Sequence, residues 1–255
     1  SVAAVAAEKG RLLGGLGREG IAVINADSEF AEQWAAAAPG PVLRFGLEAP
    51  ADIRGEWRPE GEGGRLWVRT PAGEAALTLA LPGRHNAANA LAALAAAHAL
   101  GVPLAAAAAG IEGVHPGAGR LQVRPGRDGL VVLDDTYNAN PGSLAAALDV
   151  LTQAGADRTW LVLGDMGELG DDADGWHARA GEDARARGVA RLLGVGELAA
   201  AAAEAFGAGG RAVADWHGAA AMLKDEAAAG DRILIKGSRS MRLERLVTAL
   251  TEGEG

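Results

Sequence analysis

The sequence of 255 residues contains no cysteine, one tyrosine, and only three lysines against 21 arginines. The absence of cysteine excludes disulfides, thiol catalysis and zinc–thiolate sites, and agrees with a reducing cytoplasm. No uninterrupted run of about 18 apolar residues occurs, so we expect no membrane span. No basic segment precedes an apolar stretch at the start, so we expect no signal peptide, and the missing initiator methionine suggests a fragment.

Several short motifs are also missing. The chain has no G-x-x-x-x-G-K-[ST] loop to cradle phosphates, no G-x-G-x-x-G after a strand and no G-x-S-x-G elbow. A net charge of −9 argues against a nucleic-acid-binding protein, which usually carries a basic surplus. Hydrophobic residues make up 49% of the chain, enough to bury the core of one large or two ordinary domains.

The composition is dominated by 60 alanines and 38 glycines, so the residues that escape this bias are informative. All five asparagines lie in three clusters, at Asn25, at 86–89 and at 138–140. Lys9 and Lys236 also occur in distinctive contexts, whereas Lys224 looks ordinary.

Periodicity predicts two different halves. The first half should begin with short helices and strands, continue with an antiparallel meander that has one solvent-exposed face, and end with two helices. Residues 113–119 hold three glycines and a proline, and we place the domain boundary there, giving domains 1–117 and 118–255. The expected elements of the first half are a helix over 1–16, strand 21–24, helix 30–38, strand 42–45, meander 52–80, and helices 86–100 and 103–112.

The second half alternates apolar strands with helices, a pattern typical of an α/β domain with a parallel sheet covered on both faces. Ligands of such sheets bind outside the carboxyl ends of the strands, and the polar residues fall there. Expected strands are 130–134, 160–165, 191–195, 211–214 and 232–236; expected helices are 142–153, 173–187, 197–206, 216–229 and 240–250.

The first candidate motif is Gly83-Arg84-His85-Asn86-Ala87-Ala88-Asn89. Asn86 and Asn89 should share one helix face, and an amide offers the donor and acceptor that an adenine edge requires. An alternative interpretation is that Asn86 is an N-cap.

The second motif runs from Asp134 through Asp135, Thr136, Tyr137 and Asn138 to Ser143. A carboxylate at a strand end can bind a ribose diol or a metal, and a tyrosine can stack on a base. The alternative is an Asx-rich loop that caps a helix, which would explain Asn140 and could extend to Asn138. That alternative leaves two consecutive aspartates unexplained, because they repel unless a cation lies near.

Two further motifs follow later strands. The run 164–170, Gly-Asp-Met-Gly-Glu-Leu-Gly, contains Asp165 and is equally well explained as a turn. In the run 236–241, a Gly-Ser turn opens a helix beside Lys236 and Arg239, which could bind an anion or be an ordinary basic loop. We assign His98, His115 and His217 no role, and expect His177 to be structural.

Together these runs resemble the Mur ligases of peptidoglycan synthesis, and the runs 134–141 and 236–240 are typical of the branch that adds D-alanyl-D-alanine. The resemblance spans essentially the whole chain. It implies an α/β fold, with part of a central ATP-binding domain followed by a Rossmann-like C-terminal domain. It further implies a cytoplasmic enzyme in which ATP and Mg²⁺ convert UDP-N-acetylmuramoyl-tripeptide to an acyl phosphate, which the amine of D-Ala-D-Ala then attacks.

The resemblance also implies residue roles. Lys9 matches a carbamylated lysine that holds a magnesium ion, and Arg120 matches a hinge arginine that reaches the nucleotide phosphates. Asn86 and Asn89 match adenine-reading amides, Asp135 a ribose-binding carboxylate, and Tyr137 lies beside the base. The residues expected on the substrate side are Asn138, Asp165, Lys236 and Ser238.

The chain departs from this family by lacking an N-terminal domain and the phosphate loop of the central domain. We therefore expect it to be incomplete as an enzyme. We also expect its truncated sheet to expose apolar surface, unless another chain supplies the missing segment. Two alternatives remain open: another ligase of the Mur and folylpolyglutamate type, or a non-catalytic module that binds a nucleotide or peptide.

Overall fold

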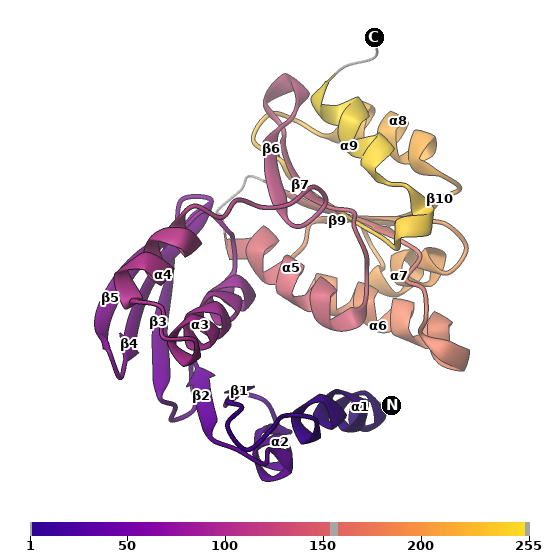
Figure 1. Cartoon of the computed structure of the whole chain (residues 1–255). Coiled ribbons are helices and arrows are strands. Elements are labelled where there is room, and N and C mark those ends of the chain that lie inside the picture. Colours follow the sequence, from indigo (N-terminus) through magenta and orange to yellow (C-terminus); the bar gives the residue numbers. More distant parts are fainter. Residues whose placement is uncertain (1, 154–157, 253–255) are drawn as a thin grey trace. The chain divides into compact units, whose positions relative to one another are not determined.

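The computed structural model describes residues 2–153 and 158–252, and the chain divides into two compact units (Figure 1). The first unit comprises residues 1–115 and the second residues 116–255. Each unit has its own sheet and its own hydrophobic core.

The first unit is built on a five-stranded sheet with the order β1-β2-β3-β4-β5. The first three strands are parallel, and β3, β4 and β5 form an antiparallel meander. All of the elements expected from the sequence are present. Their bounds are α1 Val2–Gly14, β1 Ala22–Asn25, α2 Ala31–Ala37, β2 Val42–Gly46, β3 Ile53–Glu60, β4 Gly63–Thr70, β5 Gly73–Leu79, α3 Arg84–Ala99 and α4 Leu104–Glu112.

In the meander, buried and exposed side chains alternate along each strand, as the alternation of apolar and polar residues in the sequence predicts. Along β4, Leu66 and Val68 are buried while Trp67 and Arg69 face outward. Because side chains alternate between the two faces of a strand, the inner row packs on helices and the outer row remains hydrated. Leu91 of α3 lies in the same buried cluster as Leu66, so this helix closes the core.

Helix α1 is joined to the rest of the first unit along one side only. The indole Nε1 of Trp34 on α2 donates to the carbonyl oxygen of Ala6, at 2.9 Å. The other side exposes Val2, Val5 and Leu12, with 70%, 54% and 78% of their surface accessible. This exposed apolar surface lies on a helix, whereas the expectation concerned the sheet and stays a prediction.

The second unit contains a six-stranded sheet with the order β10-β9-β8-β11-β7-β6. All neighbouring strands are parallel except β6, which is antiparallel to β7. The bounds are β6 Gln122–Pro125, β7 Val131–Asp135, α5 Pro141–Gln153, β8 Thr159–Gly164, α6 Ala173–Ala186, β9 Arg191–Val195, α7 Ala199–Phe206, β10 Gly210–Val213, α8 Trp216–Glu226, β11 Arg232–Lys236 and α9 Glu244–Thr251.

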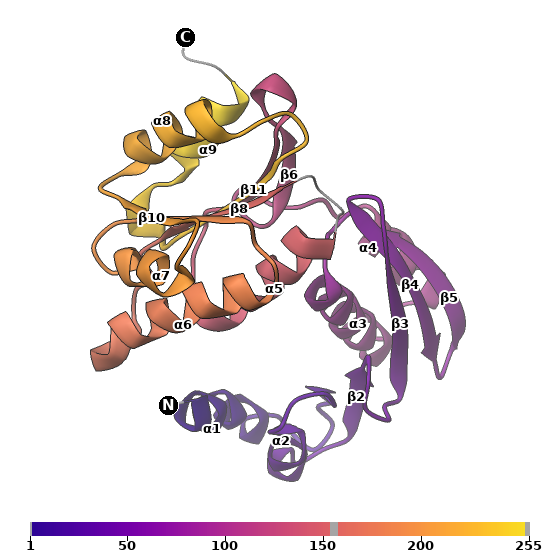
Figure 2. The same ribbon diagram turned by 180° about the vertical axis from the view of Figure 1, so that it is seen from behind.

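Helices cover both faces of this sheet, as the near-continuous apolar strands predict. Helices α5, α6 and α7 pack on one face, and α8 and α9 pack on the other (Figure 2). One strand was not predicted. Strand β6 is four residues long and ends at Pro125, so it has no clear strand pattern and is ordered by pairing with β7.

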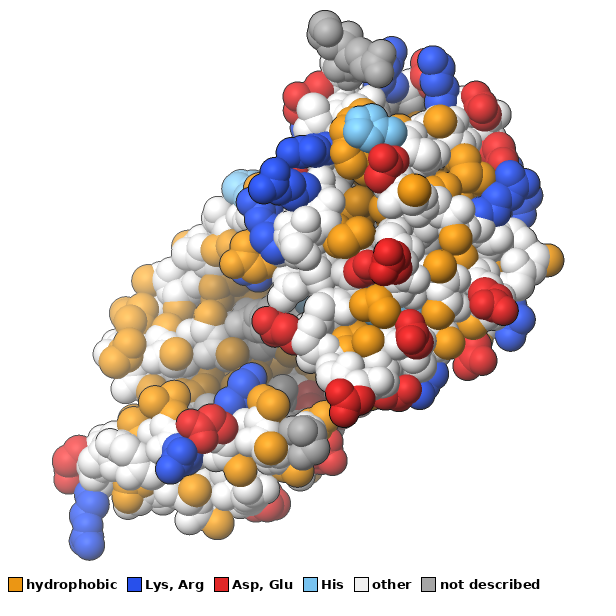
Figure 3. All heavy atoms as spheres, turned by 90° about the vertical axis from the view of Figure 1, so that its right-hand side faces the viewer, with side chains coloured by type: hydrophobic (Ala, Val, Ile, Leu, Met, Phe, Trp, Pro, Cys, Tyr) orange, Lys and Arg blue, Asp and Glu red, His pale blue; other side chains and the backbone are white. Residues whose placement is uncertain are grey.

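Acidic and basic side chains are interspersed with hydrophobic atoms over the face shown in Figure 3. Among the described residues, no helix is long and apolar enough to cross a membrane.

Candidate functional site

Three of the sequence motifs meet at one edge of the sheet in the second unit. Strand β11 lies between β8 and β7, and Lys236 at its end pairs in register with Asp135 of β7 and Leu163 of β8. The residues that follow β7, β8 and β11 therefore gather at the carboxyl ends of adjacent parallel strands. This is where open α/β sheets bind their ligands.

Lys236 supplies the cation that the two consecutive aspartates require. Its Nζ donates to Oδ2 of Asp135 at 2.5 Å and to the carbonyl oxygen of Asn138 at 2.9 Å. The other oxygen of Asp135 accepts the backbone N–H of Leu121 at 3.1 Å. Lys236 is only 1% exposed, so its ammonium group ties strand ends together inside the protein.

The rest of the 134–143 run is held by local hydrogen bonds. Oδ1 of Asp134 accepts both the backbone N–H and the hydroxyl of Thr136. Asn140 and Ser143 cap α5 reciprocally, since each side chain accepts the backbone N–H of the other residue. The capping interpretation is thus confirmed for Asn140, and the side chain of Asn138 accepts only the adjacent N–H of Ala139.

Arg120 and Tyr137 form an exposed planar pair. The guanidinium carbon of Arg120 lies 4.1 Å from the centre of the Tyr137 ring, which is 48% exposed. The neighbouring Gly119 makes this approach possible, because its φ is +70° and a Cβ there would lie 2.9 Å from the Tyr137 nitrogen. A phenol and a guanidinium together offer a stacking surface and a positive charge.

The 164–170 loop after β8 is tied to two other elements. The backbone N–H of Gly167 donates to Oγ of Ser238 at 2.7 Å, and the Ser238 N–H donates to the Asp165 carbonyl at 3.0 Å. Oδ1 of Asp165 accepts the N–H of Ala199. Asp165 and Ser238 therefore lie together at the sheet edge, and both shape this loop.

His177 is fully buried and has the structural role expected of it. Its Nε2 accepts the backbone N–H of Met166 at 2.9 Å, and its Nδ1 lies 2.7 Å from the carbonyl of Ala173. Nδ1 must then carry the proton, which leaves neither ring nitrogen free. No spacing in the sequence signals that this histidine holds the preceding loop.

In the first unit, Asn86 and Asn89 lie on one face of α3, as their spacing predicts. The Asn86 amide donates to the Pro82 carbonyl at 2.7 Å and accepts from Asn89 at 3.3 Å. The N-cap of α3 is Gly83, so the capping interpretation of Asn86 is wrong. Asn89 is exposed, and its carbonyl oxygen and one N–H have no hydrogen-bond partner among the described residues.

Lys9 lies on the exposed side of α1, one residue from the Glu8–Arg11 ion pair. The described residues contain no group of three or more His, Cys, Asp or Glu side chains placed to hold a metal ion. The structure therefore does not bring Lys9 together with other metal ligands.

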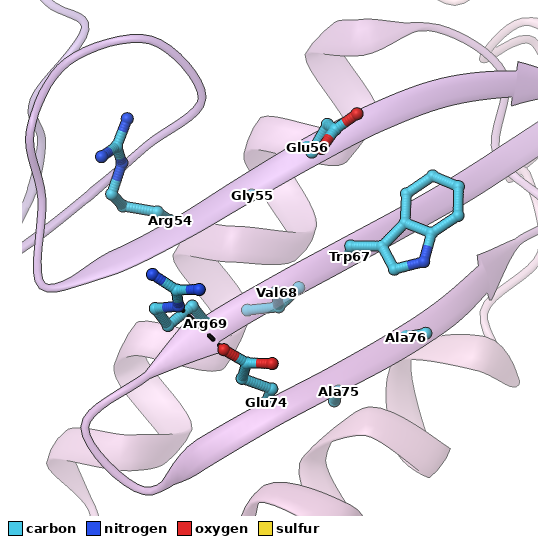
Figure 4. A pocket seen from close by; sticks show the side chains of 9 residues that line it. All are labelled: Arg54, Gly55, Glu56, Trp67, Val68, Arg69, Glu74, Ala75 and Ala76. Carbon is cyan, nitrogen blue, oxygen red and sulfur yellow. Dashed lines mark hydrogen bonds and ion pairs between the residues drawn. The ribbon is translucent and has the colours of Figure 1, made fainter.

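A shallow hollow of about 530 Å³ lies on the outer face of β3–β5 (Figure 4). Trp67 and Arg54 line it, and Arg69 pairs there with Glu74 at 2.9 Å. None of the motif residues lines this hollow. We interpret it as the hydrated face of the meander and base no function on it.

Asp27, to which the sequence motifs assigned no role, organises the loop after β2. Its carboxylate accepts the backbone N–H groups of Leu47, Glu48 and Ala49 at 2.7–3.0 Å. Burial raises the pKa of Asp27, but these bonds and Arg84 outweigh it and hold the pKa below its ordinary 3.8. Glu48 in turn pairs with Arg84 at 2.5 Å, which links this loop to the start of α3.

We expect Asp27→Ala to lower the free energy of unfolding by about 1 kcal/mol, because three N–H groups lose a charged acceptor at an exposed site. Hydrogen exchange of the amides of residues 47–49 should accelerate. The Asp27→Asn variant keeps one acceptor oxygen, so its free energy of unfolding should lie between those of the unmodified chain and Asp27→Ala. Unchanged exchange in Asp27→Ala would contradict this role.

Comparisons with known proteins show which family the chain belongs to. Residues 1–97 match the Mur ligase middle domain, and residues 119–239 match the Mur ligase glutamate ligase domain. The chain belongs to the Mur ligase family. Among curated Mur ligases, the UDP-N-acetylmuramoyl-tripeptide–D-alanyl-D-alanine ligase of Escherichia coli K12 is 38% identical over 264 residues. That match covers 99% of this chain and 56% of the relative.

Solved Mur ligase structures are similar over the same extent. A crystal structure of MurF from Acinetobacter baumannii has a TM-score of 0.88 at 29% identity, covering 96% of this chain and 55% of that one. MurF from Thermotoga maritima, in complex with ADP, has a TM-score of 0.81 at 22% identity and covers 94% and 55%. The chain thus spans about half the length of the relatives it matches.

Proposed function

We propose that this chain is the C-terminal part of a cytoplasmic, ATP-dependent ligase that joins D-alanyl-D-alanine to UDP-N-acetylmuramoyl-tripeptide. The observation that carries the proposal is the gathering of three family motifs at one sheet edge in the second unit. The similarity to ligases of that name over nearly the whole chain supports it. We assign residues 1–117 to a partial ATP-binding domain and residues 118–255 to the ligase domain.

For the nucleotide, the residues present fit the proposed ligand in part. Asn89 is exposed and retains a free donor and acceptor, which suits an adenine edge. Arg120 is exposed, so it can reach a phosphate, and Tyr137 offers a ring face. Asp135 already binds Lys236 and Leu121, so only its remaining lone pairs could accept ribose hydroxyls.

For magnesium, Lys9 is the one described residue that we assign as a ligand. We propose that Lys9, once carbamylated, would be a ligand, since an exposed lysine amine can be modified. The ion would neutralise the crowded phosphates during transfer to the tripeptide carboxylate. The remaining ligands would belong to the part of the relatives that this chain does not cover.

At the substrate side, each residue has a distinct task. Lys236 holds Asp135 and the Asn138 carbonyl, so it sets the distance between two strand ends. Ser238 and Asp165 hold the 164–170 loop. We propose that this edge receives the incoming dipeptide, with Asn138, Asp165 and Ser238 nearest to it and Lys236 acting through its two partners.

The proposal predicts binding without turnover. Incubated with ATP, UDP-N-acetylmuramoyl-tripeptide and D-Ala-D-Ala, the isolated chain should release no ADP above background, because it has no phosphate loop. Calorimetry should detect weak binding of D-Ala-D-Ala. Robust ADP release would contradict the incompleteness, and a preference for D-glutamate over the dipeptide would favour another ligase of the family.

A further inference from the structure

A single residue in the 164–170 loop has an unusual backbone. Glu168 has a φ of +61°, in the left-handed region that favours glycine. Its side chain is exposed, and no hydrogen bond or ion pair engages it within the described part of the chain. A non-glycine residue in this region costs about 1–2 kcal/mol, so it persists only where its surroundings enforce it.

Hydrogen bonds to the two residues that precede Glu168 supply that enforcement. Met166 is 1% exposed, and its N–H is held by the buried ring of His177. Gly167 is held by the hydroxyl of Ser238. With both preceding residues fixed, the chain turns at Glu168, whose side chain is exposed.

The other left-handed residues of the second unit have structural explanations. Leu121 is buried and donates its N–H to Asp135. Asp128 lies in the tight turn between β6 and β7, and Arg242 ends the short helical turn 239–241. Glu168 has no such packing or hydrogen bond among the described residues, although Gly167 precedes it.

We propose that Glu168 binds the ammonium group of the incoming D-Ala-D-Ala, with His177 and Ser238 as positioning residues. This rests on the proposed function, because it assumes that the dipeptide binds at this edge. The α-amino group of a peptide has a pKa of about 8, so near pH 7 it is mostly a cation with three N–H donors. An anchored, unpaired carboxylate beside the carboxyl ends of β8 and β11 is suited to receive it.

The first test removes the amino group of the ligand and the carboxylate of Glu168 separately. N-propionyl-D-alanine is D-Ala-D-Ala without its amino group. By calorimetry, the unmodified chain should bind it about 10–100-fold more weakly than the dipeptide, the loss typical of a charged hydrogen bond. Glu168→Gln should bind the dipeptide about as weakly as the unmodified chain binds N-propionyl-D-alanine. Its affinities for the dipeptide and for N-propionyl-D-alanine should be nearly equal. If Glu168→Gln discriminates as strongly as the unmodified chain, the pairing is overturned.

The second test uses the backbone. Glu168→Gly should raise the unfolding temperature by about 1–3 °C, because glycine relieves the left-handed strain, and should still weaken dipeptide binding. Asp128→Gly is the matched control, because Asp128 is also left-handed but precedes β7, away from the carboxyl ends of the strands. This variant should also be stabilised, but it should bind the dipeptide normally. Normal binding by Glu168→Gly would show that Glu168 is only a turn residue and overturn the inference.

The positioning role is tested by shape-conserving variants of the histidine. His177→Gln can still accept the Met166 N–H and should retain most of the affinity, whereas His177→Leu cannot and should lose about tenfold or more. Equal affinity in both would overturn that role. If the unmodified chain binds no D-Ala-D-Ala at all, the proposed function fails, and this inference fails with it.

Discussion

Replacing Lys236 by methionine should lower the free energy of unfolding by about 3–5 kcal/mol. Methionine fills a similar volume but leaves the carboxylate of Asp135 without its cation, at a side chain that is only 13% exposed. The Asn138 carbonyl loses its donor as well. Since whole domains are stable by only about 5–15 kcal/mol, this single change should make the second unit marginal.

Urea unfolding followed by circular dichroism would measure the effect. Lys224→Met is the matched control, because Lys224 is exposed on α8, and it should change stability by less than about 0.5 kcal/mol. The double variant Lys236→Met, Asp135→Leu should regain much of the loss, since no buried charge is then left unpaired. A Lys236→Met variant as stable as Lys224→Met would contradict the pairing.

The second large effect is expected at Asp231, which lies at the opposite end of β11. Asp231 is 1% exposed and accepts hydrogen bonds from the guanidinium of Arg158, the indole of Trp160 and the N–H of Ala228. Asp231→Ala would leave the buried indole N–H without an acceptor. We expect a loss of about 2–3 kcal/mol, against little change for Asp225→Ala on the exposed side of α8.

The same carboxylate should make stability depend on pH. Burial raises the pKa of Asp231, but hydrogen bonds from Arg158, Ala228 and Trp160 outweigh it, so the folded pKa lies below the ordinary 3.8. Its contribution is therefore complete above about pH 4 and is lost as the pH falls through the folded pKa. Between pH 5 and 3, the unmodified chain should lose more stability than Asp231→Asn. Parallel curves would argue against this linkage.

The sequence predicted the order of the elements well because their patterns are local. The β4 alternation, the apolar strands of the second unit and the Asn140 cap each depend on neighbours within a few residues. Strand β6 escaped prediction because it is short and ends at Pro125, and it is ordered by a distant strand. Asn86 was open to two interpretations, and only the position of Gly83 excluded the cap.

By itself, the sequence determined that two adjacent carboxylates, Asp134 and Asp135, follow a strand and need a cation. It could not name that cation, because Lys236 is 101 residues away and the sheet order decides which strand lies beside β7. The tertiary structure placed β11 there and turned the lysine inward, where it binds Asp135 and the Asn138 carbonyl. Local patterns are set by helix and strand geometry, whereas the pairing of distant charges depends on which strands become neighbours.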